Sequence, residues 1–327
     1  MRGPIDLRAS LDQLARGGLP LRARERLADE AGPNRKLFTS DLSVNEHVLV
    51  RSAACEPISQ VMGSSIYQVG SVPDFKGRSG ELEVISNAHR ESRALALYRL
   101  AQEAALVGAD AVVGVHLRDR MITMGTRGKG GDAGGEVLEF TVVGTAVRAP
   151  WIRHHPGQPV LTDLSGQDVW ALHADGFEPC GFLFEFCRYH VFHVTDGWNR
   201  GGELSSASRA VDTARAIASN KVLAQAAQQG AEFVVGSDVT VRVHEVPCGY
   251  GDCELDDLDV DVSWFGTGVR RLRGAERHDP PPLVLSMMPL GRRRGPVIEA
   301  EDDTEEIRRS AEDAEEAALE WSEYSGQ

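Results

Sequence analysis

The chain has 327 residues, of which 42% are hydrophobic and 26% are charged, and its formal net charge is −14. This length favours about two domains, and the composition is that of a folded chain, so whole-chain disorder, a collagen-like chain and a pure coiled coil are excluded. The negative charge argues against nucleic acid or an anionic membrane surface as the partner.

The sequence carries no signal for a membrane or an export pathway. No stretch approaches the roughly 18 consecutive apolar residues of a membrane-spanning helix, and the first residues lack the apolar core of a secretory signal. Five cysteines are few and odd in number, which fits a reducing compartment better than a disulfide framework. We therefore expect a cytoplasmic protein without a membrane span.

Residues 1–36 show two short helical patterns. Leu7, Leu11 and Leu14 share one helical face before Gly17-Gly18, and a second pattern covers 21–28 after Pro20. We expect a helical appendage that packs on the domain that follows.

The next part of the chain occurs twice. Residues 37–148 align without a gap to residues 159–270, 122 positions later, with 30 identities in 112 positions. We interpret this as a tandem duplication. We call residues 37–148 copy one and residues 159–272 copy two, with 149–158 as the linker between them. The identities include Asp41-Leu42-Ser43 with 163–165, Gly80-Glu81-Leu82 with 202–204, and Val112-Val113-Gly114 with 234–236.

Each copy predicts the same order of elements, β-α-β-β. In copy one a strand is expected near 46–54, followed by an irregular stretch, a helix over 86–107 that ends at Gly108, and strands over 111–117 and 138–147. The counterparts in copy two are 168–174, 206–229 before Gly230, 233–243 and 258–269. The fold class is therefore α+β, with one long helix on a small antiparallel sheet in each copy.

The strand that begins at Ala111 has no polar face. A single helix covers only one side of a sheet, so the other side of Val112 and Val113 needs a second cover. We expect a further copy of the same sheet to supply it, so that the domains assemble within the chain and between chains.

Three motifs of copy one resemble the YbjQ family, which is also labelled "putative heavy-metal-binding domain". They are Gly77-Arg78-Ser79-Gly80 before the helix, 108–115 after it, and Gly144-Thr145-Ala146-Val147 on the last strand. Copy two departs from the pattern with Asn199, Glu232, Phe233 and Ser237. The resemblance implies a dodecin-like fold and a ring-shaped homo-oligomer, typically a pentamer.

After residue 273 the character of the chain changes. Residues 274–327 hold 14 Asp or Glu and 6 Arg, so they carry −8 of the total charge of −14. Asp279-Pro280-Pro281-Pro282 predicts an extended linker, and Thr304 begins a helical pattern that is rich in acids. This tail is either a solvated, flexible and partly helical segment or a docking segment for a protein partner.

A hairpin of copy two is a candidate metal site. If Tyr250-Gly251 forms its tip, Cys248 faces Cys253, and the polar positions Thr240, Arg242 and His244 face Asp261, Asp259 and Asp257. The cysteines, with His244 as a third ligand, suit a soft divalent metal. However, His244 lies about 13 Å along the strand from Cys248, so a charge ladder or a disulfide at the tip stays open.

Other polar residues give weaker signals. Gly125–Gly130 looks like a phosphate loop but joins two strands, so we expect a hairpin tip. Cys180, Cys187, His190 and His193 lie in an aromatic segment and are expected to fill the core. Both copies keep arginines that suit ion pairs and leave anion binding open, among them Arg78 with Arg200, Arg93 with Arg215, and Arg148 with Arg270.

No nucleophile with its base recurs in both copies, so we predict a protein that is not an enzyme and needs no cofactor. The leading hypothesis is an oligomer-forming scaffold or binding module whose tail, residues 274–327, docks a partner. The alternatives are a heavy-metal-binding or metal-sensing protein that uses Cys248 and Cys253, and a small-ligand binder with sites at subunit interfaces.

Overall fold

The computed structural model describes residues 7–31, 39–69, 78–124, 135–193, 203–246 and 257–274. All of them belong to one compact unit, residues 1–277. No helix in these ranges is long and apolar enough to cross a membrane.

The secondary structure follows the 122-residue offset seen in the sequence. Helices α3 and α5, helices α4 and α6, and strands β3 and β7 are each related by that offset at both ends. The elements of the first half are α1 (Leu7–Ala15), α2 (Leu21–Ala31), α3 (Val44–Ser52), β1 (Glu56–Gln68), β2 (Gly80–Glu81), α4 (Glu83–Leu106), β3 (Ala111–Met124) and β4 (Gly135–Arg148). Those of the second half are β5 (Val160–Leu161), α5 (Gly166–Ala174), β6 (Phe177–Val191), α6 (Ser205–Gln228), β7 (Phe233–Val246) and β8 (Asp257–Arg271).

The strands form two four-stranded sheets. Sheet A has the order β1-β4-β3-β5, and sheet B has the order β2-β6-β8-β7. The long strands are antiparallel to their neighbours, whereas the short β5 runs parallel to β3. Each sheet therefore takes one two-residue strand from the other half of the chain, β5 in sheet A and β2 in sheet B.

The expected first strand of each copy is wrong. Residues 44–52 and 166–174 are helical, and the strand lies one segment later, in β1 and β6, where an irregular stretch was expected. Capping boxes explain the helices, because Ser43 and Glu46 bond each other's backbone N–H groups, and Ser165 and Asp168 do the same. The other expected elements are present, with ends that differ by a few residues.

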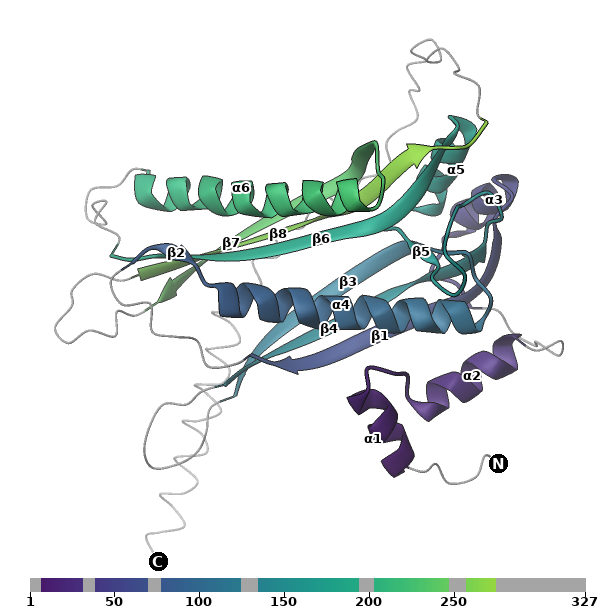
Figure 1. Ribbon diagram of the computed structural model, residues 1–327, viewed down its shortest axis with the longest axis horizontal. Coiled ribbons are helices and arrows are strands. Elements are labelled where there is room, and N and C mark those ends of the chain that lie inside the picture. Colours follow the sequence, from purple (N-terminus) through teal and green to yellow (C-terminus); the bar gives the residue numbers. More distant parts are fainter. Residues whose placement is uncertain are drawn as a thin grey trace, which may run out of the picture. The chain divides into compact units, whose positions relative to one another are not determined.

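Helix α4 lies between the two sheets, and α6 lies on the opposite face of sheet B (Figure 1). The main hydrophobic cluster accordingly joins Ala96 and Leu100 of α4 to Phe140 of β4 on one side and to Phe184 and Phe186 of β6 on the other. The two halves share this core. The N-terminal helices reach α4 as well, through an ion pair of 3.0 Å between Arg26 and Glu103.

Helix α4 approaches β1 closely at Gly63. A Cβ atom at this position would lie 2.0 Å from the carbonyl oxygen of Ala96 and 2.6 Å from the nitrogen of Leu100. Both are backbone atoms of α4, so the helix itself would have to move. Glycine at position 63 therefore sets the spacing between the helix and sheet A.

We predict that Gly63→Ala lowers the free energy of unfolding by about 1–3 kcal/mol, because an added methyl group would overpack this contact. Ser64→Ala is the matched control, since the exposed Ser64 side chain lies on the other face of the same strand. Urea denaturation followed by circular dichroism measures both variants, and equal stability of the two would contradict the role of Gly63.

Candidate assembly interface

One edge of sheet A is closed by the first residues of copy two. We call residues 160–164 the second arm. Its backbone is hydrogen-bonded to β3 at 2.9–3.0 Å: Val160 and Thr162 donate to Asp110 and Val112, and Gly114 and Val115 donate back to Leu164 and Thr162. This edge of β3 is thereby removed from solvent.

The equivalent edge of sheet B is open. Within the described residues β7 pairs with β8 alone. The side chain of Ala111 in β3 is fully buried, whereas its counterpart Phe233 in β7 is 39% exposed. Val115 is buried but its counterpart Ser237 is exposed. The β7 edge has the geometry that accepts an arm, and no arm lies along it in the part of the chain that the structure describes.

A second connection runs in the opposite direction. Strand β2, from the first half, adds to the edge of β6 opposite His190 and Tyr189, and the N–H of Leu82 donates to the carbonyl of Arg188 at 2.8 Å. The chain then enters α4, which lies on sheet B. The first half therefore contributes a strand and a helix to the second half and receives an arm in return.

An ion-pair network holds this connection. Glu81 accepts from Arg90 of α4 at 2.7 Å and from Lys221 of α6 at 3.1 Å, and Arg90 also pairs with Glu185 of β6. Burial by itself raises the pKa of Glu81, but Lys221 and Arg90 outweigh burial and lower the pKa. Glu81 is thus a charged link between the helices of the two halves.

The outer face of sheet A has no cover of this kind among the described residues. Met62 and Ile66 of β1 are 49% and 76% exposed. Their counterparts in β6, Phe184 and Arg188, are buried beside α4, where Phe184 contacts Arg93 and the Arg188 N–H donates to Ser86. Sheet A therefore exposes two apolar side chains, Met62 and Ile66, at the place where sheet B receives a helix.

Helix α6 shows the complementary difference. Helix α4 buries residues on two sides, including His89 and Arg93, whereas α6 buries a single stripe from Ala210 to Ala226. Arg215, the counterpart of Arg93, is exposed. One side of α6 is thus free, and that side corresponds to the side of α4 that covers sheet B.

The structure corrects the expected environment of the Val-rich strand. Val112 and Val113 are fully buried, and they lie in different clusters on the two faces of sheet A. Val113 packs with Val50 of α3, Leu164 of the second arm and Val169 of α5. Short helices and the second arm cover most of this face, Val235 of sheet B packs against the same cluster, and all of them come from the same chain. Within the described residues, the strand that lacks a cover at its edge is instead β7.

The predicted hairpin register of copy two is also wrong. His244 pairs with Asp259, Arg242 with Asp261 and Thr240 with Ser263, which is a shift of two residues. Such a shift keeps every side chain on its predicted face, so alternation alone does not distinguish the two registers. The predicted polar face itself is present.

His244 has a different partner from the predicted metal. Its Nε2 lies 3.0 Å from Asp261, and Arg188 makes two hydrogen bonds of 2.6 and 2.7 Å to the same carboxylate. Cys248 and Cys253 lie outside the described residues, so the metal site stays a prediction. In the described ranges no three His, Cys, Asp or Glu side chains are grouped as metal ligands would be.

Of the residues in the aromatic segment that were expected to fill the core, Cys187 does so, whereas His190 forms an ion pair. Cys187 is buried in the core next to α6, and burial raises its pKa to about 12. His190, however, pairs with Asp259 at 2.8 Å, and this hydrogen bond raises its pKa despite burial. The sequence argument missed the pairing because it treated β6 as irregular.

Comparisons with known proteins find one family model and a curated relative. A family model for YbjQ, described as "Putative heavy-metal-binding", matches residues 56–150. The "Encapsulin nanocompartment protein Rv1762c" of Mycobacterium tuberculosis (strain ATCC 25618 / H37Rv) is 36% identical over 263 residues, which are 77% of this chain and 92% of that protein. No solved structure matches the chain.

The matched residues run from β1 to just past β4, so copy one is a YbjQ-type domain, as its motifs predicted. The chain as a whole belongs to the family of the mycobacterial encapsulin nanocompartment protein. Neither description names an enzyme.

We predict that Asp261→Asn lowers the free energy of unfolding at pH 7 by about 3 kcal/mol, because it leaves Arg188 buried beside a neutral side chain. Burial tends to raise the pKa of Asp261, but Arg188 and His244 bring it down to about 2. Because this value is below the ordinary 3.8, the carboxylate stabilises the fold above about pH 4 and loses its effect as the pH falls toward 2.

Denaturation between pH 7 and pH 2.5 measures this contribution. The stability difference between the wild type and Asp261→Asn should shrink over the acid end of the range. A difference that stays constant with pH would contradict the assignment.

Proposed function

We propose that the chain is a tandem duplication of one dodecin-like domain and that it works as a non-enzymatic, oligomer-forming scaffold. The duplication is supported by paired structural details at the 122-residue offset. Gly114 and Gly236 both have positive φ, and each lies within a β-bulge at the same place in its strand. Such details follow from a common backbone rather than from a shared composition.

We call the contact between the two halves, which is made by β2, α4 and the second arm, the internal joint. It supports assembly because it is heterologous, which means that the two halves contribute different surfaces to it. The first half contributes β2 and α4, and the second half contributes the second arm, so different surfaces meet. The second half keeps an open β7 edge and a free side of α6. The first half keeps an uncovered sheet face and residues 39–43, which are the counterpart of residues 161–165 and which we call the first arm. A head-to-tail contact between two chains can therefore repeat the internal joint.

In this arrangement the first arm of one chain pairs with β7 of the next. Helix α6 then covers Met62 and Ile66 of the neighbouring sheet A, as α4 covers Phe184 and Arg188 inside the chain. Phe233 and Ser237 become buried under the arm. The same contact repeated closes into a ring or continues as a filament, depending on the rotation at each step.

The size of the ring is a separate proposal. The pentamer implied by the YbjQ resemblance, if it counts chains, corresponds to five chains and ten copies. A ring of five copies cannot be made of whole chains that hold two copies each, so a closed ring contains an even number of copies.

The name of the mycobacterial relative adds a setting for the scaffold. We propose that this chain is likewise associated with an encapsulin nanocompartment in the cytoplasm, and that residues 274–327 dock the partner. A pull-down with the full chain and with a chain that ends at residue 273 tests the tail. Equal recovery of partners by the two would remove its proposed role.

We predict that two variants, each with a substitution in one of the two surfaces of the head-to-tail contact, prevent assembly. Ile66→Asp places a charge on the uncovered face of sheet A, and Ser237→Asp places one under the proposed arm. Each substitution would bury an unpaired charge in the joint and so weaken assembly by about 2 kcal/mol or more. Each variant alone should be a monomer, and a 1:1 mixture should form a dimer through the one undamaged pair of surfaces.

Size-exclusion chromatography with light scattering measures these masses. Thr213→Glu on α6 is the control, because its counterpart Glu91 stays exposed beside the internal joint. A wild-type chain that is monomeric at micromolar concentration, or a control variant that also dissociates, would contradict the proposal.

The description of the family, "Putative heavy-metal-binding", favours one second candidate, a metal-binding protein that uses Cys248 and Cys253 with His244. Here we predict that wild-type protein made without an affinity tag binds about one Zn²⁺ per chain and that Cys248→Ser abolishes it. Equilibrium dialysis followed by elemental analysis measures the ratio. Equal zinc contents of the two proteins would exclude these cysteines.

A further inference from the structure

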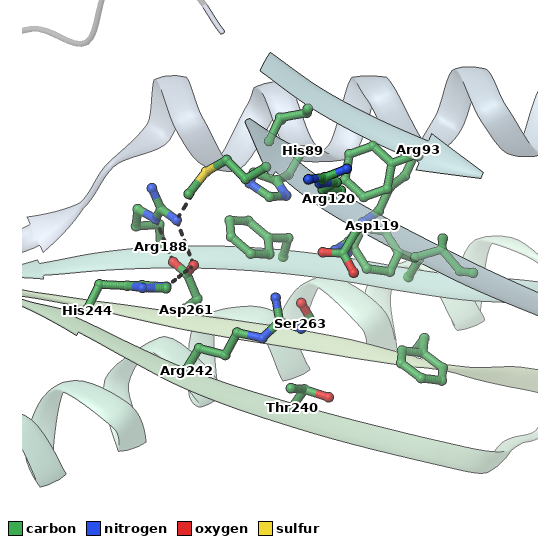
Figure 2. A pocket seen from close by; sticks show the side chains of 17 residues that line it. His89, Arg93, Asp119, Arg120, Arg188, Thr240, Arg242, His244, Asp261 and Ser263 are labelled. Carbon is green, nitrogen blue, oxygen red and sulfur yellow. Dashed lines mark hydrogen bonds and ion pairs between the residues drawn. The ribbon is translucent and has the colours of Figure 1, made fainter. Parts of the chain in front are cut away.

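A cavity of about 240 Å³ lies between α4 and the two sheets, within a single chain. Residues of both halves line it (Figure 2). Four arginines and two aspartates are among them, so the lining has two more positive than negative charges before its histidines are counted. The excess is unexpected in a chain whose total charge is −14.

The deepest of these charges is Arg93, which is 1% exposed. Its guanidinium lies over the ring of Phe184, 3.8 Å from the ring centre, and 4.7 Å from that of Phe140. Only Nη2 has an acceptor, Asp119 at 3.2 Å, whereas Nε and Nη1 are buried without a hydrogen-bond partner. Leaving charged N–H groups unpaired in a protein interior is costly, so such groups indicate a missing acceptor.

His89 adds to this demand. It is buried on the same helix, stacked on Phe186 with ring centres 3.7 Å apart, and neither of its ring nitrogens has a partner. Burial, together with the charge of Arg93, lowers the pKa of His89 to about 2, so the ring is neutral at pH 7 and carries one N–H donor.

The carboxylates of the cavity are already engaged. Asp261 is held by Arg188 and His244, and Asp119 is held by Arg93. Arg120 and Arg242, which occupy the same position in the two halves, both line the cavity and form no ion pair with any described residue. Two like charges at one cavity repel each other unless an anion lies between them.

We propose that this cavity binds a small oxyanion, the phosphate group of inorganic phosphate or of a small phosphomonoester. Its oxygens would accept hydrogen bonds from Arg93 and His89, and Arg242 would balance its charge. The hydroxyls of Thr240 and Ser263 offer further donors, and the phenylalanine side chains offer an apolar wall for an attached organic group. The site needs both halves of one chain and does not depend on assembly.

Inorganic phosphate and phenyl phosphate are the probes, each compared with chloride at equal ionic strength. Titration calorimetry on the full chain should show saturable binding of at least one of them. Arg242→Gln should weaken that binding about tenfold, since it removes one charge-assisted contact. Arg209→Gln is the matched control, because it removes the same charge from an exposed position on α6, outside the cavity lining.

Thermal melting gives a second readout. Phosphate should raise the Tm of the wild type above its value in chloride, and the rise should be absent in Arg93→Gln. If Arg93→Gln does not fold, Arg242→Gln still decides the matter. The proposal is overturned if neither probe binds the wild type. It is also overturned if Arg242→Gln and Arg209→Gln have equal affinity for the probe that the wild type binds. A response to phenyl phosphate alone identifies an organic phosphate as the ligand.

Discussion

The architecture depends on a helix that is shared by two sheets. Helix α4 packs against β1 and β4 with one side and against β6 with the other, and Gly63 allows the first of these contacts. Because the helix is buried on both sides, its polar residues need partners inside the protein, and Arg90 finds one of them, Glu185, across the joint. Arg90 meets Glu81 and Glu185, and Arg93 meets Asp119 and the phenylalanine rings. Helix α6 has only one such contact, and the asymmetry of the chain follows from this difference.

Much of the fold could be predicted from the sequence. The two long helices, their glycine stops and the paired strands β3–β4 and β7–β8 were identified because their patterns are long and bounded by turn signals. The helices α3 and α5 were missed because nine-residue segments with several branched residues look like strands, while the deciding signal was the capping pair Ser43–Glu46. The register of β7 was missed because a two-residue slip preserves the alternation of polar and apolar residues. In the observed register, Arg188 and His190 of β6 form ion pairs with the aspartates of β8.

The joint between the halves was harder to foresee. Its two short strands, β2 and β5, are too brief to show periodicity, although Glu81 and Leu82 belong to one repeated motif and Asp163 and Leu164 to another. Repetition of these residues was the available signal, and the sequence argument interprets it as a sign of tandem duplication and not of pairing between copies. The cavity was beyond sequence reasoning, because Arg93 and Arg242 are 149 positions apart and meet only when the halves stack. That both copies keep an arginine at the position of Arg93 was the one hint, and its counterpart Arg215 is exposed.

The divergence of the two copies has a consequence for how such an assembly would come apart. The internal joint is lined by Phe184, Arg188 and His89 and is covalently tethered, whereas the surfaces left for neighbours present Met62, Ile66 and Val211 in the corresponding places. Strong contacts within chains and weaker contacts between chains would then alternate around the assembly. Dilution would separate it into intact polypeptides, and subunits could exchange between particles while every anion-binding chamber remains whole.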